Sequence, residues 1–419
     1  MTAIVGFLNK HCVAVAADSA VTFGNTHKVV NSANKIFSLS KYAPVGIATY
    51  NNASFMGTPW EIIIKQYRKE LGNKTLPHLC DYSNNFIDYL HEKNFFVSED
   101  VQKNHLLNMI YHVYGLILND ESLSSLREEE KPSKFAELLA NAITLLQKFN
   151  QRSEEFRDYT IDDFNRYTKD IISNILNREM YLTEASTRDL FIQTVYEYSK
   201  ACMADIYTTG LVFFGYGEDE IYPCLYNIEV ANAFDHRLRY YVNKNNEAHI
   251  GDDSLSQQAA IRPFAQTDVT TTILRGIHPR FMQTFSKTYL ASLQMVQRMT
   301  LAQLPQDKAY ENIRTQVENL DLNKLSNDYS NHMFQDLQTN YTDHLLDTIT
   351  HLDKEDLANM AESLVSLTSL IRRMSPGEET VGGPIDVAII SKGDGFIWKK
   401  RKHYFERELN EQYFHNYYL

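Results

Sequence analysis

The chain has 419 residues, of which 43% are apolar, so it is long enough to bury a large core. Its 53 acidic and 41 basic residues give a net charge of −12, which argues against nucleic acid and an anionic membrane surface as partners. Cys12, Cys80, Cys202 and Cys224 form no CxxC pair, and they predict buried thiols in a reducing compartment rather than a disulfide framework.

The N-terminal segment carries no targeting pattern. Thr2–Leu8 is a short apolar run without a basic leader. No stretch of the chain reaches the ~20 consecutive apolar residues that a membrane-spanning helix needs. We therefore expect a soluble cytoplasmic protein.

Short strands are expected at the start of the chain. Thr2–Leu8 and Cys12–Ala17 are apolar runs rich in strand-forming residues, and the polar residues Asn9-Lys10-His11 form a turn between them. Lys35–Phe37 and Val45–Ala48 predict two further short strands. These four segments place the first strands of a sheet within the first fifty residues.

Two long helical blocks interrupt the strands. The first covers residues 60–204, and its clearest helix begins after Pro132-Ser133, where apolar residues recur at helical spacing. The second covers residues 255–375. Further strands are predicted between and after these blocks, at Gly210–Gly215, Pro223–Val230, Ile385–Ile390 and Phe396–Trp398, the last two joined by a Gly393-Asp394-Gly395 hairpin turn.

The order of elements is strands, helices, strands, helices, strands. Apolar strands at both ends and in the middle of the chain indicate one sheet system with helices packed on its outer faces. No internal repeat or low-complexity linker divides the sequence. We expect a single elaborated α+β domain over residues 1–419, with residues 60–204 and 255–375 as its helical layers.

The N-terminal threonine is the first candidate for chemistry. Thr2 follows the initiator Met1, and its small side chain is what methionine removal requires. Removal would expose a hydroxyl and a free α-amine on the same residue. An α-amine has a pKa of about 7.7–8.0, so it is able to accept the hydroxyl proton near neutral pH. This is the arrangement of an N-terminal nucleophile.

Two charged residues extend this candidate. Asp18 follows the second predicted strand, and a hairpin of the first two strands brings it back beside residue 2. Lys35 stands where another short strand begins. A lysine beside the threonine hydroxyl favours its ionised form, and an aspartate beside that lysine keeps it charged and oriented.

The segment from Thr2 to Ser40 resembles the start of a mature proteasome β subunit and of the related bacterial ATP-dependent protease core. These proteins begin with a catalytic threonine, and they carry an aspartate sixteen residues on and a lysine before a short strand. Their catalytic residues correspond to Thr2, Asp18 and Lys35, although the interval from Asp18 to Lys35 is one residue longer than usual here. Ser19 belongs to the same Ala-Asp-Ser turn.

The resemblance is weaker around this triad. Tyr50 stands at the position of the family's oxyanion-hole glycine, where its backbone N–H would serve as the donor. Gly251 lies in the segment that corresponds to a supporting Gly-Ser-Gly loop, whose serine is missing. Glu378 takes the place of a supporting aspartate near the last strand, and the family's neighbouring serine is replaced by Val381.

The resemblance implies a four-layer αββα sandwich of the N-terminal-nucleophile hydrolases with enlarged helical layers. It also implies a threonine-type peptidase that needs no cofactor or metal and forms a homo-oligomer. Its substrate would be a peptide or an unfolded protein. Because no ATP-binding motif is present, a separate ATPase or regulator would supply any unfolding. Two alternatives stay open, a small-molecule amidase of the same class and a non-catalytic assembly subunit.

Overall fold

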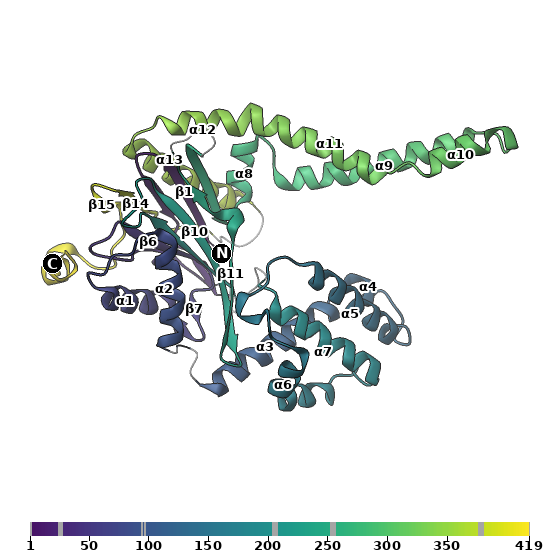
Figure 1. The fold of residues 1–419 in the computed structure, drawn as a ribbon, viewed down its shortest axis with the longest axis horizontal. Coiled ribbons are helices and arrows are strands. Elements are labelled where there is room, and N and C mark those ends of the chain that lie inside the picture. The colour runs from purple at the N-terminus through teal and green to yellow at the C-terminus, as the bar shows by residue number, and fades with distance from the viewer. Residues whose placement is uncertain are drawn as a thin grey trace. The chain divides into compact units, whose positions relative to one another are not determined.

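The computed structural model describes residues 2–23, 28–93, 95, 98–202, 208–251, 257–375 and 381–418. It has mixed α+β structure with antiparallel sheets, which confirms the predicted α+β class, whereas the four-layer sandwich stays a prediction (Figure 1). The chain divides into two compact units. Unit 1 contains Met1–Asn31 and Ile250–Val387, and unit 2 contains Ser32–His249 and Ala388–Leu419. The single domain over 1–419 stays a prediction.

Unit 1 is built on a sheet in which the N-terminal strand has a neighbour on each side. Strands lie in the order β13 (Ala259–Ala265), β1 (Ala3–Asn9), β2 (Val13–Ala17) and β14 (Asp386–Ser391), and the chain passes into unit 2 within β14. Every residue of β1 and β2 is buried. A separate ribbon pairs β3 (Val21–Phe23) with β4 (Lys28–Val30).

Strand β13 corrects the expectation that the second helical block begins near residue 255. Residues 259–265 form a strand paired with β1, and the helices begin only at Asp268. Pro263 within this segment argues against a central strand, because proline has no N–H for the ladder. β13 lies at the edge of the sheet, where a proline is tolerated, and this explains why the sequence pattern missed it.

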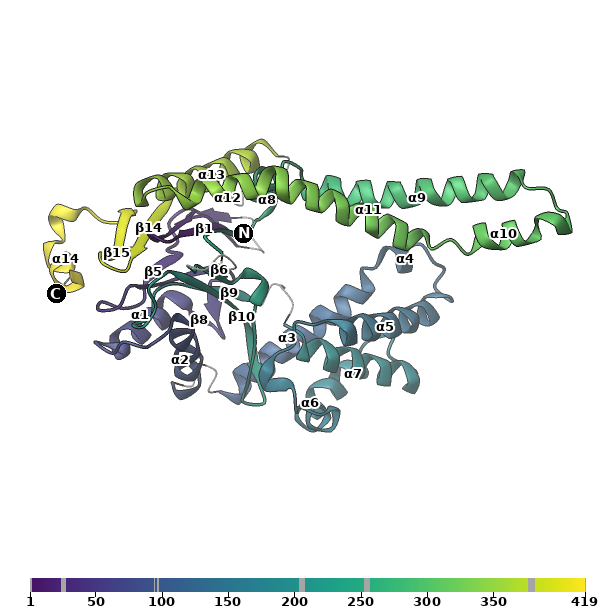
Figure 2. The same cartoon turned by 45° about the horizontal axis from the view of Figure 1, so that its top comes forward.

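The remaining helices of unit 1 follow β13. They are α8 (Asp268–Arg275), α9 (Pro279–Gln303), α10 (Glu311–Glu318), α11 (Leu322–Leu337), α12 (Asp343–Thr350) and α13 (Lys354–Met374), with short η3 (Lys308–Tyr310) and a π-helical turn η4 (Gln338–Thr342). Helix α13 packs on β1 and β2, and α12 packs on β13. Helices α9 and α11 lie side by side as a long hairpin (Figure 2).

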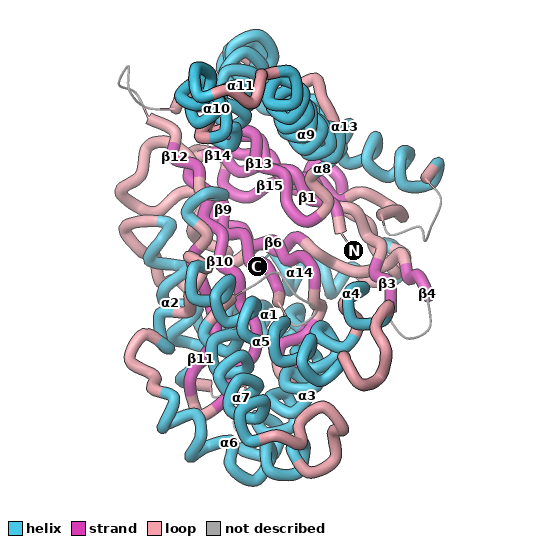
Figure 3. The backbone as a smooth tube through the Cα atoms, turned by 90° about the vertical axis from the view of Figure 1, so that its right-hand side faces the viewer, coloured by secondary structure: helices cyan, strands magenta, loops and turns pink. Residues whose placement is uncertain are grey.

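Unit 2 contains a second antiparallel sheet. Its strands lie in the order β11 (Arg237–Val242), β10 (Cys224–Phe234), β9 (Thr209–Gly215), β6 (Val45–Asn51) and β5 (Ile36–Ser38), and β12 (Ala248–His249) also pairs with β10. Figure 3 shows β9, β10 and β11 next to one another. Four of these strands match predicted ones, and β11 was not predicted. β14 leads into β15 (Gly395–Lys400) through the expected turn at Gly393–Gly395. β7 (Ser54–Phe55) and β8 (Thr58–Pro59) form a small ribbon.

The helices of unit 2 confirm the helical character predicted for residues 60–204 over the described part of that block. They are α1 (Trp60–Leu71), α2 (Leu79–Glu92), α3 (Glu99–Leu118), α4 (Glu121–Ser124), α5 (Lys131–Lys148), α6 (Ile161–Leu176) and α7 (Ala185–Lys200), with α14 (Glu411–Tyr418) near the C-terminus and three short turns η1 (Glu154–Phe156), η2 (Lys244–Asn246) and η5 (Arg407–Leu409). Across the described residues, no helix combines the length and the apolar character needed to cross a bilayer.

Unit 2 has two apolar cores. In the first, α1 and α2 pack on the sheet around Trp60, Phe86 and Phe213. In the second, α3, α5, α6 and α7 pack on one another, and Phe234 at the end of β10 joins this cluster to the sheet. The helical block is therefore an ordered body with its own interior.

Candidate active site

The hairpin of β1 and β2 sets the position of the predicted catalytic residues in unit 1. The Asn9 side chain accepts hydrogen bonds from the N–H groups of His11 (2.9 Å) and Cys12 (3.3 Å), which closes the turn between the strands. Its amide donates to Ile349 and Leu352 backbone carbonyls, both at 2.9 Å. The register pairs Ile4 with Ala17, so residue 18 lies opposite residue 3.

Asp18 is fully enclosed at the end of this hairpin, with 1% of its surface exposed. One carboxylate oxygen accepts the N–H of Ala3 at 2.9 Å. The other accepts the N–H groups of Ala20 at 3.0 Å and Gly382 at 3.1 Å. The Asp18 N–H also donates to the Ala3 carbonyl at 3.2 Å. The carboxylate therefore fixes the backbone directly after Thr2.

Thr2 lies at the start of β1 and is 3% exposed. Its carbonyl accepts the N–H of Gln266, at 3.2 Å, just after β13. Arg372 on α13 donates a hydrogen bond to the Gln266 side chain and forms an ion pair with Asp268. Thr2 is thus held from two sides, by β13 and by the residues around Asp18. Met1 lies outside the described residues.

Lys35 belongs to unit 2, directly before β5. Only 4% of its surface is exposed, so it is not a solvated surface charge. Its carbonyl accepts the N–H of Thr49 on β6 at 2.8 Å. Lysine is seldom buried this fully in folded proteins. This burial sets Lys35 apart from an ordinary surface lysine.

Tyr50 lies in the middle of the second sheet, on β6. The N–H of Thr49 points toward β5, because it donates to the Lys35 carbonyl. Backbone N–H groups alternate in direction along a strand, so the N–H of Tyr50 points the other way, toward β9. On β9, Tyr50 is paired with Gly210. To donate to an oxyanion as predicted, the Tyr50 N–H would have to turn away from β9. The next N–H, that of Asn51, faces the β5 side, and Asn51 has a positive φ of 66°.

The Tyr50 side chain joins a buried polar cluster that the sequence did not indicate. Its hydroxyl donates to Asn227 Oδ1 at 3.1 Å and forms a short hydrogen bond with Glu229 Oε1. Burial raises the pKa of Tyr50 well above its usual range and also raises the pKa of Glu229. Burial thus disfavours the charged form of both groups.

The three predicted supporting residues have different surroundings. The Ser19 N–H donates to the Gly382 carbonyl at 3.0 Å, and its hydroxyl forms a short hydrogen bond with the Pro384 carbonyl. The Gly251 N–H donates to the Gln257 carbonyl at 3.1 Å. Glu378 lies outside the described residues. Ser19 is thus a second link between the end of β2 and the segment before β14.

The thiols and metal-binding side chains of the described residues offer no competing site. Burial raises the pKa of Cys12 to about 12 and also raises the pKa of Cys80, so neither thiol favours the reactive thiolate at neutral pH. Cys12, Cys202 and Cys224 are buried, as predicted, whereas Cys80 is only half-buried, so the prediction was wrong for that residue. Within the described ranges, no group of three or more His, Cys, Asp and Glu side chains is arranged to hold a metal ion.

Sequence reasoning placed Asp18 beside the N-terminus and missed what holds it there. Gly382 follows Asp18 by 364 residues and supplies one of the three backbone donors to its carboxylate. Gln266 and Arg372 were also missed, because nothing in their local sequence distinguishes them from surface polar residues. For Gly382 the sequence did contain one signal, the Gly382-Gly383 pair before the strand predicted at Ile385–Ile390.

Comparison with known proteins adds little to this geometry. No protein-family model matches the chain, and no curated protein matches it. Among solved structures it is similar to one described as an Anbu (Gly-1) mutant from Hyphomicrobium sp. strain MC1, with 10% identity and a TM-score of 0.28, covering 100% of this chain and 92% of that chain. A TM-score of this size does not establish a shared fold, so the site is interpreted from its own residues.

Proposed function

We propose that the chain is a threonine-type hydrolase that cleaves peptide bonds with Thr2 after removal of Met1. The observation that carries the proposal is the Asp18 carboxylate, which is buried and bonded to the N–H of Ala3 directly after Thr2. An N-terminal nucleophile must be held still although it stands at a chain end, where proteins usually fray. Asp18 and Gln266 supply that restraint for Thr2.

The proposed chemistry uses two groups of one residue. The α-amine of Thr2, unprotonated near neutral pH, takes the hydroxyl proton while the oxygen attacks the peptide carbonyl. The protonated α-amine passes that proton to the leaving nitrogen, so collapse of the tetrahedral intermediate breaks the C–N bond, releases the amine product and leaves an ester on Thr2. A water molecule, activated by the same α-amine, attacks the ester and releases the acid product with regeneration of the hydroxyl.

Other parts of the proposal rest on the sequence pattern. Lys35 is the residue proposed to stabilise the ionised hydroxyl, and a backbone N–H at Tyr50 or Asn51 is proposed as the oxyanion donor. The four-layer αββα sandwich, the homo-oligomer and a separate ATPase or regulator belong to the same proposal. An unfolded protein or peptide is the proposed substrate.

The test is the intact mass of the purified chain before and after treatment with a peptide epoxyketone. This reagent forms a stable adduct only with a hydroxyl and a free amine on the same residue. We expect loss of Met1 and one adduct per chain. Thr2→Ala should abolish the adduct, whereas Thr2→Ser keeps both reacting groups and should retain it.

Two further variants separate structural roles from chemistry. Lys35→Met should lower the rate of adduct formation without changing the number of adducts. Ser153→Ala serves as a matched control, because it removes a buried hydroxyl of unit 2, bonded to the Leu238 carbonyl at 3.1 Å, that has no proposed role in the reaction. An unlabelled chain from which Met1 has been removed would contradict the peptidase and favour a small-molecule amidase.

A second candidate is a non-catalytic assembly subunit, favoured by the burial of Thr2, which is only 3% exposed. A nucleophile needs an open path for its substrate, whereas a structural residue does not. Retention of Met1 in the purified protein, together with no adduct, would refute the hydrolase and support this candidate.

A further inference from the structure

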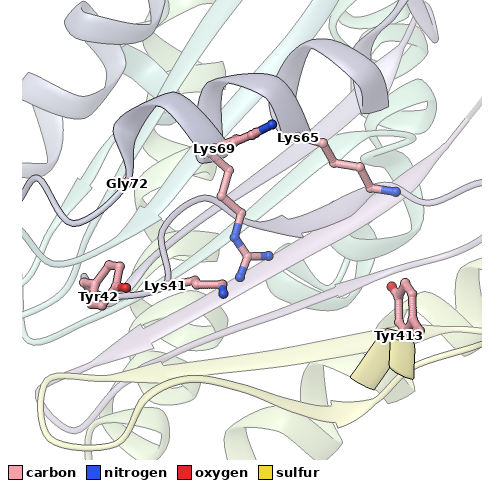
Figure 4. A pocket seen from close by; sticks show the side chains of 7 residues that line it. Lys41, Tyr42, Lys65, Lys69, Gly72 and Tyr413 are labelled. Carbon is pink, nitrogen blue, oxygen red and sulfur yellow. The ribbon is translucent and has the colours of Figure 1, made fainter. Parts of the chain in front are cut away.

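A basic pocket lies in unit 2, away from the residues discussed above. It is a cavity of about 440 Å³ between α1, the loop from β5 to β6, and α14 (Figure 4). Four basic side chains, two tyrosines and one glycine line it: Lys41, Tyr42, Lys65, Arg68, Lys69, Gly72 and Tyr413. We call this cavity the basic pocket. Its volume falls within the range of small-molecule sites.

The charge of the pocket is strongly one-sided. Lys65 forms an ion pair with Glu61 at 2.5 Å, one turn earlier on α1, so part of its charge is compensated. Lys41, Arg68 and Lys69 are the other three cations of the lining. None of the described lining residues is acidic. In a chain with a net charge of −12, this concentration of positive charge creates a local site for an anion.

Helix stability alone explains part of this arrangement. Arg68 and Lys69 occupy the last turn of α1, where cations interact favourably with the negative end of the helix. Lys41 is not on that helix. It comes from the loop after β5 and lies below α1 in Figure 4. Cations from two separate elements therefore converge on one space.

Two aromatic rings complete the lining. Tyr42 is 62% exposed and Tyr413 is 36% exposed, which is unusual for large side chains that border a cavity. They lie at opposite sides of the pocket in Figure 4. A neighbouring cavity of about 360 Å³ shares Lys41, Tyr42 and Arg68 with the first, so a ligand has room to extend past Tyr42.

We propose that the basic pocket binds a small organic polyphosphate of the nucleotide type. Arg68 and Lys69 would contact its phosphates together with Lys41, and an exposed tyrosine ring would pack against its base. Several cations grouped within one small cavity match the dense charge of a di- or triphosphate. They match less well an acidic peptide, whose carboxylates are spread along an extended chain. This inference does not depend on the proposed hydrolase.

The test is isothermal titration of the full chain with three probes, namely ATP without magnesium, tripolyphosphate and adenosine. We expect ATP to bind most tightly, tripolyphosphate more weakly and adenosine not at all. Affinity for ATP should fall as salt is raised from about 50 mM to about 300 mM, because the contacts are charged and partly exposed. A hexaglutamate peptide serves as the competing ligand class.

Variants connect binding to the pocket. Lys41→Gln and Lys69→Gln should each weaken ATP binding by about five-fold or more, because each removes one charge–phosphate contact. Lys103→Gln is the matched control. Lys103 is a lysine of α3, paired with Glu99, and it does not line the pocket, so its loss of charge should leave the affinity unchanged. Circular dichroism confirms that each variant is folded.

Three results would overturn the proposal. One is the absence of binding by the unmodified chain at about 1 mM ATP, a concentration that detects even weak sites. Another is hexaglutamate binding as tightly as ATP, which would identify an acidic peptide site. The third is unchanged affinity in both Lys41→Gln and Lys69→Gln, which would place the ATP elsewhere on the molecule.

Discussion

Replacing Asp18 by asparagine tests whether its carboxylate fixes the N-terminal strand. The carboxylate accepts three backbone N–H groups, one on Oδ1 and two on Oδ2. Asparagine keeps one oxygen, which is able to accept from Ala3. Its NH₂ group then faces the N–H groups of Ala20 and Gly382, and two donors meet no acceptor. Asp18→Asn therefore removes two charge-assisted hydrogen bonds in a buried position.

The expected loss follows from those two bonds. A hydrogen bond to a charged group contributes about 1.5–3 kcal/mol to stability, so the substitution should cost about 3–6 kcal/mol. Since about 1.4 kcal/mol corresponds to a factor of ten in an equilibrium constant, amide exchange from β1 and β2 by local opening should accelerate roughly 100- to 10,000-fold. The effect should be confined to unit 1.

Hydrogen exchange measured by mass spectrometry is the suitable assay, because both tryptophans, Trp60 and Trp398, belong to unit 2 and do not report on β1. The matched control is Asp353→Asn, an exposed residue of unit 1 that caps α13 by accepting the N–H of Asp356 at 2.9 Å. Asparagine caps helices as well as aspartate does, so exchange there should not change. An acceleration below about three-fold in β1 for Asp18→Asn would refute the reasoning.

Three further predictions concern unit 2 and use tryptophan fluorescence in urea. Arg239→Leu should lower the stability of unit 2 by about 3 kcal/mol. The reason is that the fully buried guanidinium donates to the Ala201 carbonyl at 2.6 Å and to Asn232 Oδ1 at 2.7 Å. An unchanged urea midpoint would show that these hydrogen bonds contribute nothing. Gly210→Ala should cost about 1–3 kcal/mol, because a Cβ there would lie 1.9 Å from the Tyr50 ring, whose hydroxyl is anchored. Gly115→Ala, which meets no atom within 4 Å on α3, should instead be neutral or stabilising; equal losses in both variants would contradict the crowding argument. The hydrogen bond from His91 to Glu155 at 2.7 Å raises the folded-state pKa of His91 above its usual value of about 6.5. Its contribution, below about 1 kcal/mol, is therefore full below pH ~6.5 and lost as pH rises through the raised pKa. The stability difference between the unmodified chain and His91→Gln should shrink from about pH 5.5 to about pH 9, and a difference that grows would reverse the assigned sign.

Local patterns in the sequence were sufficient for several strands and for the helical character of two long segments, but not for most individual helices. The apolar runs at β1, β2, β6, β9 and β14 and the glycine-rich turn before β15 each contain their own signal, so their boundaries were predicted within a few residues. β13 was missed because Pro263 conceals a strand that only its position at a sheet edge permits. A local pattern does not report sheet position.

Only the part of the candidate site that lies within the β1–β2 hairpin was predictable from the sequence. Asp18 was expected beside residue 2 because two short strands joined by a tight turn leave no other place for it. Gly382 donates to Asp18 and Gln266 donates to Thr2, although each lies hundreds of residues away in the sequence. No local sequence pattern encodes such contacts. The direction of the Tyr50 N–H depends on strand register, and one residue of shift would reverse it.

The path of the chain through its two units has a consequence during synthesis. β1 is complete after nine residues, but its neighbour β13 begins at residue 259, and the intervening residues 32–249 form most of unit 2. At about 5–20 residues per second, the roughly 250 residues between them take on the order of 10–50 s to emerge from the ribosome. Throughout that interval the chain lacks the strand that later covers one edge of β1 and the Gln266 that later binds Thr2. If Met1 is removed as proposed, the aminopeptidase therefore has access to the nascent N-terminus before β13 pairs with β1.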